Sequence, residues 1–286
     1  MIELKNEKIA VPVVLFAGLL WSFGPLVVRY MDQPQLVPWQ YIFGRGLTIF
    51  IILNLYLYFE EGINFYKNYK KIGKSGLLGG CGLGVAMISF IYSITNTSAA
   101  ITLLCLAAMP FFTALLAFLF LKERISLNVW ISIFIATIGI IIMAFGNTEK
   151  SSVIGFIFGI TSSIGFSVFS VTLRWRKETP KFTTVAIAGL FCFVVATMVI
   201  LTKNQPFFAT SYNSTMFSLH GTLVCLGLIL YSIGSKAIPA AELTLLSLTE
   251  VIGGIFWVWL PLFGINEVPS TNTIVGGFFL FVSIIY

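Results

Sequence analysis

The chain has 286 residues, of which 58% are hydrophobic and only 10% are charged, and its mean hydropathy is +0.97. A soluble chain usually has about 25% charged residues, so too few remain here to cover a water-soluble globule. The composition excludes a cytosolic or secreted globular protein and indicates an integral membrane protein. The net charge of +6 is ordinary for such a protein, because basic residues collect in cytoplasmic loops.

Ten apolar segments are long enough to cross a membrane as helices. Such a helix needs about 20 apolar residues for roughly 30 Å of hydrocarbon. No small-residue cleavage site follows the first segment, so we expect a membrane helix there and not a cleaved signal peptide. The connections are short, the longest lying near 60–74 and 203–216, so we expect one all-α membrane domain. In chain order the segments are residues 9–30, 38–59, 75–95, 99–121, 127–146, 153–175, 182–202, 217–236, 239–264 and 271–286.

The basic residues predict the orientation of these helices. With the N-terminus inside the cell, thirteen of them fall in inner loops and three in outer loops, and Arg45 stays within a segment. Positive charge favours cytoplasmic loops, so both termini are expected to be cytoplasmic. The inner set is Lys5, Lys8, Lys67, Lys70, Lys71, Lys74, Lys122, Arg124, Arg174, Arg176, Lys177, Lys181 and Lys236, and the outer set is Arg29, Lys150 and Lys203.

A pattern recurs in the chain at an interval of about 140 to 145 residues. Residues 92–94 and 98–104 read YSI and SAAITLL, whereas residues 231–233 and 239–246 read YSI and PAAELTLL. Five helices per half bring the second copy into the membrane from the opposite side, so residues 1–146 and 147–286 are predicted to be inverted repeats. Many secondary transporters have this architecture, with the substrate site near the midplane between the repeats. Chance similarity between leucine-rich helices is the alternative.

Residues 98–124 resemble the signature of the drug/metabolite transporter superfamily, EamA-type branch. The resemblance rests on Ser98–Ala100, on Pro110 and on Glu123 thirteen residues later, with support from Trp21–Gly24 and Arg45. It extends over the chain as two five-helix copies. It implies a ten-helix transporter of small metabolites such as amino acids, nucleotide-linked compounds, osmolytes or drugs, and it does not name the substrate.

The second copy departs from the family pattern at two places. Val251 follows Glu250 where the family often has proline, and the interval from Glu250 to Glu267 is about three residues longer than expected. The added length falls near residues 261–266, so the outer end of the ninth segment is expected to differ from its counterpart.

Two charged residues are predicted to lie within the membrane, where each costs about 2.5–3.5 kcal/mol on the insertion scale. Glu250 lies about eleven residues into the ninth segment, and Arg45 about seven into the second. Glu250 is a candidate for binding a substrate ammonium and for proton coupling, because burial disfavours the charged form of a carboxylate. Arg45 is a candidate for binding a carboxylate. The alternatives are a structural pair across about 9 Å of helix rise and an Arg45 side chain that reaches the outer interface.

Three aromatic residues complete the candidate substrate-binding set. Trp21 has two interpretations, stacking on a ring or quaternary ammonium or packing against a neighbouring helix. Tyr92 and Tyr231 occupy matching positions in the two copies. Two tryptophans of the ninth segment, Trp257 and Trp259, are interpreted as packing residues.

Proline and glycine give further structural predictions. Pro25 and Pro110 are candidate kinks or gates, because a proline inside a helix frees a backbone carbonyl. The glycines at 79, 80, 82 and 84 are not a phosphate loop, since no strand precedes them and no GK[ST] follows. Their spacing favours close helix approach. His220, near the outer start of the eighth segment, is a proton-relay candidate, and Glu123 is interpreted as a boundary residue.

The sequence therefore favours a secondary transporter that moves a small organic metabolite by alternating access. The expected substrate is amino acid-like, betaine or cationic, or aromatic, with export favoured and proton coupling as an option. An uptake carrier or exchanger is the alternative, and a non-transporting structural or receptor-like subunit is the alternative from another class.

Several partners and activities are not expected. The four cysteines lie in apolar runs without metal-ligand spacing, and no nucleotide-binding motif or nucleophile with a base is found. We therefore expect no enzyme, no metal, no cofactor and no nucleic acid. The expected partners are the small-molecule substrate, the lipid bilayer and protons, with the chain as a monomer or homodimer. The abundance of Lys, Ile, Asn and Phe indicates an AT-rich bacterial genome and hence the bacterial inner (plasma) membrane.

Overall fold

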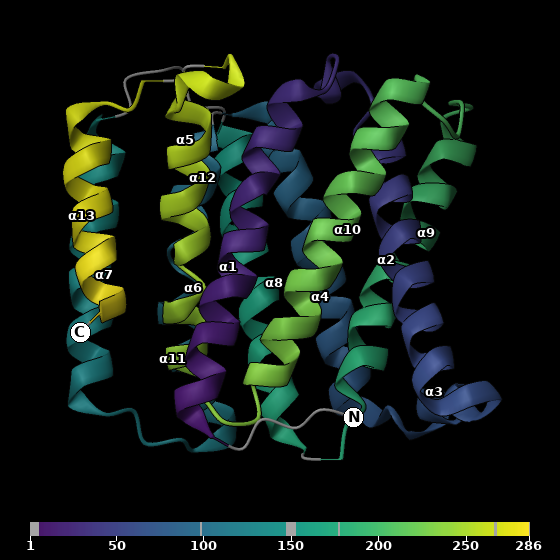
Figure 1. Ribbon diagram of the computed structural model, residues 1–286, viewed down its shortest axis with the longest axis horizontal. Coiled ribbons are helices and arrows are strands. Elements are labelled where there is room, and N and C mark those ends of the chain that lie inside the picture. Colours follow the sequence, from purple (N-terminus) through teal and green to yellow (C-terminus); the bar gives the residue numbers. More distant parts are fainter. Residues whose placement is uncertain (1–5, 98, 147–152, 177, 266–267, 286) are drawn as a thin grey trace.

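The computed structural model of the protein describes residues 6–97, 99–146, 153–176, 178–265 and 268–285. In these ranges the regular structure is helical and contains no strand, which confirms an all-α fold (Figure 1). The uninterrupted long helices are α1 (Glu7–Tyr30), α2 (Pro38–Glu61), α4 (Gly73–Asn96), α7 (Leu127–Gly146), α8 (Val153–Trp175), α9 (Lys181–Thr202), α10 (Ser211–Gly234) and α13 (Thr271–Ile285). Of the residues used above, Lys5, Ser98, Lys150, Lys177 and Glu267 lie outside the described ranges.

Two of the predicted segments fold as interrupted helices. The fourth consists of α5 (Ala99–Leu106), α6 (Met109–Leu116) and a π-helical turn, η3 (Ala117–Leu121). The ninth consists of α11 (Ala240–Leu246) and α12 (Thr249–Trp259). At both junctions i→i−3 hydrogen bonds replace the α-helical pattern, as in the bonds from Ala108 N to Cys105 O and from Leu248 N to Leu245 O. A tight turn of this kind inside a helix often marks a functional hinge.

Eight helical stretches of the described chain are long and apolar enough to cross a membrane. Two shorter apolar stretches, Leu127–Ile142 and Ile274–Ile285, coincide with the fifth and tenth predicted segments. The protein is therefore a multi-pass membrane protein.

Three predicted boundaries are wrong. The connection at 60–74 is helical, because η2 (Gly62–Tyr66) and α3 (Lys67–Lys71) follow α2 directly. Helix α10 begins at Ser211 and not at 217, since the Thr210 hydroxyl accepts a hydrogen bond from Asn213 N and caps a polar first turn. The ninth segment ends at Trp259, because Leu260 is extended and a 3₁₀ turn, η4 (Pro261–Phe263), follows.

Glycine determines how closely the long helices pack. A Cβ on Gly165 of α8 would lie 2.6 Å from the carbonyl oxygen of Gly82 on α4, so the two backbones touch there. Helices α2 and α9 meet in the same way, where a Cβ on Gly46 would lie 2.9 Å from the oxygen of Gly189. Small residues of this kind let membrane helices approach closely. The predicted role of the glycine run in α4 is confirmed.

One end of the bundle collects most of the basic side chains. The N-terminal end of α1, helix α3 and the connections 122–126, 178–180 and 235–239 lie at the same end in Figure 1. We call this the basic end. Helices α7 and α13 pack against each other at one edge of the bundle (Figure 1).

Candidate functional site

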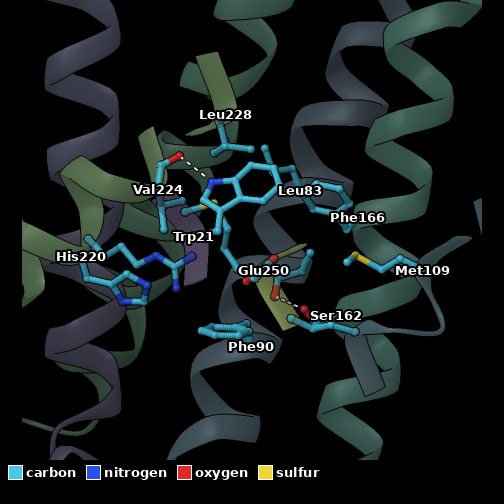
Figure 2. Close-up of a pocket in the computed structure, with 14 residues that line it drawn as sticks. Trp21, Leu83, Phe90, Met109, Ser162, Phe166, His220, Val224, Leu228 and Glu250 are labelled. Atoms are coloured by element: carbon cyan, nitrogen blue, oxygen red, sulfur yellow. Dashed lines mark hydrogen bonds between the residues drawn. The ribbon is translucent and has the colours of Figure 1, made fainter. Parts of the chain in front are cut away.

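A cavity lies between the helices (Figure 2). Seven helices line it, and both interrupted helices reach it beside their junctions, through Leu106 and Met109 of the first and Glu250 of the second. The wall is mostly apolar. The lining residues are Trp21, Arg45, Leu83, Ala86, Met87, Phe90, Leu106, Met109, Ser162, Phe166, His220, Val224, Leu228 and Glu250.

Glu250 brings a carboxylate into this cavity from the first turn of α12. In the view of Figure 2 it lies between the rings of Trp21 and Phe90. Its side chain is only half-buried, and no side chain of the described chain donates a hydrogen bond to its carboxylate. The first turn of a helix favours a negative charge. The sequence placed Glu250 near the middle of its segment, and the cavity makes its carboxylate available to a ligand.

Arg45, on α2, lines the same cavity but is almost fully buried, with 5% of its surface exposed. Its guanidinium carbon lies 5.5 Å from the centre of the Phe90 ring, which is a cation–π contact. Its Nε and Nη1 atoms are buried without a hydrogen-bond partner. Within the described chain Arg45 and Glu250 do not form a salt bridge. The guanidinium neither reaches the outer interface nor pairs directly with the glutamate.

His220 also lines the cavity, a position that the sequence did not predict. Its predicted place near the outer boundary is wrong, because α10 begins six residues earlier than expected and the side chain is buried. Its Nδ1 shares a hydrogen bond with the Tyr41 hydroxyl. A Cβ on Gly24 would lie 2.8 Å from its Nε2, so glycine leaves room for the imidazole.

The Trp21 ring forms part of the wall of the cavity. Its indole N–H donates to the carbonyl oxygen of Val224 over 3.2 Å, which joins α1 to α10 (Figure 2). Its ring centre lies 5.5 Å from that of Phe166 and 5.4 Å from that of Tyr231. Tyr231 is fully buried and does not line the cavity. It therefore supports the Trp21 and Phe166 rings from behind.

Tyr92 lies away from the cavity. Its ring packs against Trp39 and Phe158, with ring centres 5.3 and 5.1 Å apart. Of the other tryptophans, Trp257 stacks on Phe23 at 4.6 Å and donates a hydrogen bond to the Ser22 hydroxyl over 2.8 Å. These contacts agree with its interpretation as a packing residue.

The two candidate prolines occupy different settings. Pro110 is in the first turn of α6, directly after the first helix interruption. Ser167 of α8 donates a hydrogen bond to the carbonyl oxygen of Met109 over 3.1 Å, and Ser163 donates to that of Cys105 over 2.5 Å. Side chains of α8 therefore bind backbone carbonyls around this junction. Pro25 lies within α1, which continues through it to Tyr30.

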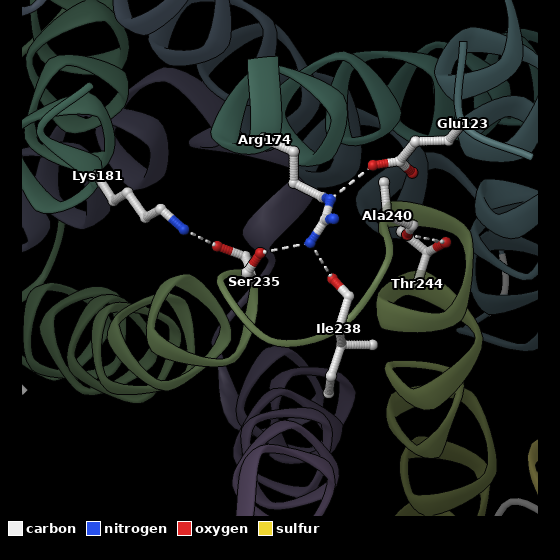
Figure 3. Close-up of polar contacts among 7 residues, drawn as sticks. All are labelled: Glu123, Arg174, Lys181, Ser235, Ile238, Ala240 and Thr244. Carbon is white, nitrogen blue, oxygen red and sulfur yellow. Dashed lines mark hydrogen bonds and ion pairs between the residues drawn. The ribbon is translucent and has the colours of Figure 1, made fainter. Parts of the chain in front are cut away.

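A polar network at the basic end joins segments that are far apart in the sequence (Figure 3). Arg174 Nε lies 2.7 Å from Oε1 of Glu123, and its Nη1 donates to the carbonyl oxygens of Ser235 and Ile238 at 3.2 and 2.7 Å. Lys181 Nζ donates to the Ser235 hydroxyl over 2.6 Å. We call these residues the Arg174 network. Glu123, interpreted from the sequence as a boundary residue, has a specific partner here.

Residues 8–145 match the EamA-like transporter family. The match covers 138 of the 286 residues and falls on the first of the two predicted copies, so this part of the chain is similar to that family. Two Helicobacter pylori proteins, from strains J99 and 26695, are each described as an uncharacterized transporter. Both are 25% identical to this chain over 249 residues, which covers 84% of this chain and 80% of theirs. A solved crystal structure matches 98% of this chain and 96% of its own with a TM-score of 0.73 at 17% identity, a likeness of fold alone.

Proposed function

We propose that the protein is a secondary transporter that moves a small organic metabolite across the membrane through the cavity at Glu250. One observation carries the proposal: both interrupted helices meet a single cavity that contains two charged side chains at membrane depth. Charge in a membrane helix is expensive and is usually kept for a ligand or ion path. Interrupted helices that meet at the substrate site are typical of secondary transporters.

We further propose that residues 1–146 and 147–286 form two inverted five-helix repeats, which gives ten membrane helices. The packing supports this division. The contact of α4 with α8 has its counterpart in the contact of α10 with α1, and α2–α9 and α7–α13 are contacts between equivalent helices. The interruption after Leu106 has its counterpart after Leu246. The basic end would then face the cytoplasm.

Alternating access requires that the cavity be closed toward one side at a time. Three layers support closure toward the basic end. On α8, Phe166 lines the cavity, Phe169 packs below it against Tyr231 with ring centres 6.2 Å apart, and Arg174 follows in the last turn. Phe169 and Tyr231 are fully buried. We propose that the aromatic layer and the Arg174 network form the inner gate.

Export driven by protons is the favoured direction and coupling. Glu250 is the candidate proton carrier, because its carboxylate faces the cavity without a fixed hydrogen-bond donor among the described residues. Uptake or exchange through the same cavity remains the alternative, and a structural or receptor-like subunit is the alternative without transport.

A ligand screen tests the proposal. Detergent-purified protein is heated with amino acids, betaines, polyamines and nucleosides, and a ligand of the folded state raises the melting temperature. Glu250→Gln should abolish the shift at unchanged baseline stability. Glu242→Gln is the matched control, since Glu242 lies on α11 before the same interruption but does not line the cavity. A shift that survives Glu250→Gln would reject this site, and a fall in baseline stability alone would assign Glu250 a structural role.

A further inference from the structure

The two charges in the cavity have no strong partner among the described residues, and the rest of the wall offers almost no free polar group. We infer that the substrate is a zwitterion with an apolar side chain, such as an apolar α-amino acid, whose carboxylate binds Arg45 and whose ammonium binds Glu250. This inference rests on the proposed function, because it names the substrate class of the same cavity.

The buried guanidinium of Arg45 lacks hydrogen-bond acceptors. A guanidinium can only donate hydrogen bonds, and two of its buried nitrogen atoms, Nε and Nη1, lack an acceptor. A buried donor without an acceptor is costly. The Phe90 ring makes a cation–π contact with the guanidinium but provides no hydrogen-bond acceptor atom. A ligand carboxylate supplies the missing acceptors through charge-assisted hydrogen bonds.

The carboxylate of Glu250 lacks a hydrogen-bond donor among the described side chains. Its carboxylate is an acceptor-only group when ionised, it is partly accessible, and no described side chain donates to it. An ammonium group brings three donors and a compensating charge. Glu250 enters the cavity from α12 and Arg45 from α2, so the two charges come from separate elements.

The charge balance disfavours simple ions while Glu250 is ionised. Arg45 and Glu250 are the charged residues among those that line the cavity, and the Nδ1 atom of His220 is hydrogen-bonded to Tyr41. A lone cation would leave Arg45 unpaired, and a lone anion would leave Glu250 unpaired. An uncompensated buried charge is strongly unfavourable. A ligand that carries both charges satisfies both groups.

The remaining wall selects the side chain of the substrate. The Trp21 N–H is already bound to Val224 O, and the Ser162 hydroxyl donates to Ala86 O over 2.9 Å. Phe90, Phe166 and Leu228 present only apolar surface. A sugar or another polyhydroxylated substrate would lose hydrogen bonds to water and gain few here. An aliphatic or aromatic side chain loses none.

A comparison of three ligands with the same apolar side chain tests the inference on the wild-type protein. Binding to detergent-purified protein is measured by titration calorimetry for L-leucine, for 3-methylbutylamine, which lacks the carboxylate, and for 4-methylpentanoate, which lacks the amine. L-Phenylalanine, 2-phenylethylamine and 3-phenylpropanoate form a second set. Each amino acid should bind about ten- to a hundredfold more tightly than its two relatives, as expected for the loss of one charge-assisted hydrogen-bonded pair.

Two variants assign the groups. Arg45→Gln should weaken amino-acid binding about ten- to a hundredfold without weakening the binding of the amine. Glu250→Gln should weaken amino-acid binding by a similar factor without weakening the binding of the acid. Glu242→Gln should change the binding of none of these ligands. If the amine or the acid binds the wild-type protein as tightly as its amino acid, or if neither amino acid binds, the inference is wrong. Glu250-dependent binding of putrescine or uridine in place of the amino acids would retain the transporter and reject the zwitterion.

Discussion

Arg174, in the last turn of α8, joins Glu123 to the carbonyl oxygen of Ile238, with distances of 2.7 Å on both sides. Glu123 follows the first interrupted helix, and Ile238 precedes the second. One guanidinium therefore connects the basic-end termini of the two helices whose junctions meet the cavity. Movement of either helix at this end requires these bonds to break.

Arg174→Ala should open the cavity toward the basic end. A partly exposed ion pair supported by carbonyl hydrogen bonds contributes about 1–2 kcal/mol, which changes the ratio of open to closed molecules about five- to thirtyfold. The measurement is the rate at which a membrane-impermeant thiol reagent labels a cysteine introduced at Ser162, in protein without its four native cysteines. Arg176→Ala is the matched control, since Arg176 is exposed. Equal labelling in both variants would contradict the gate.

Amino-acid binding should weaken as the pH falls. A proton on Glu250 competes with the substrate ammonium for the same carboxylate, so the ionised form binds and the protonated form does not. Arg45 and His220 face the same cavity, so the decisive comparison is between proteins at each pH. Calorimetric affinity should decline toward acid in the wild-type protein and stay flat in Glu250→Gln. A decline of equal size in the variant would assign the dependence to another group, with His220→Gln as the next variant to measure.

Tyr41→Phe should destabilise the fold. It removes the hydrogen-bond partner of His220 Nδ1 in a fully buried setting, which costs about 1–3 kcal/mol. The melting temperature in detergent should fall clearly. Tyr212→Phe removes a hydroxyl from an exposed tyrosine and should leave the melting temperature unchanged. No difference between the two variants would show that the Tyr41–His220 bond adds nothing to stability.

Gly46→Leu should disrupt the crossing of α2 and α9. Its first side-chain atom alone would lie 2.9 Å from Gly189 O and 2.8 Å from Cys192 Cβ, and overpacking of this kind costs about 1–3 kcal/mol or more. We expect a lower melting temperature and less monodisperse protein in size-exclusion chromatography. Gly277→Ala is the control, since a Cβ there meets no atom within 4 Å. A stable Gly46→Leu protein would mean that the crossing tolerates wider spacing.

The positions of the long helices were predictable, because hydropathy reports membrane burial directly. The helix interruptions were not. The first has Pro110 as a signal, but the second, at Ser247–Leu248, has no proline and lies in a run as apolar as its surroundings. Its i→i−3 hydrogen bonds depend on packing between helices, which a single segment does not encode.

The depth of the candidate residues along their helices was largely predictable, but the side of the helix to which each side chain points was not. Glu250, Arg45 and Trp21 line one cavity, whereas Tyr92 does not. Phe90 lines the cavity instead, because residues two positions apart on a helix, such as Phe90 and Tyr92, point to nearly opposite sides. The depth of His220 was misjudged because the polar residues 211–216 belong to α10 and were assigned to a loop. The Arg174–Glu123 pair joins positions 51 residues apart, so only the fold reveals it.

The backbone contact between Gly82 and Gly165 limits how this bundle can move. Where side chains separate two helices, a change of rotamer lets the helices slide or part. At a contact between two glycine backbones there is no side chain whose rotamer could change. We therefore expect helices α4 and α8 to move together, although they come from opposite halves of the chain, and the same holds for α2 and α9, which touch at Gly46 and Gly189. We expect an opening of the cavity to separate helices whose contacts are made by side chains, and to leave these glycine contacts in place.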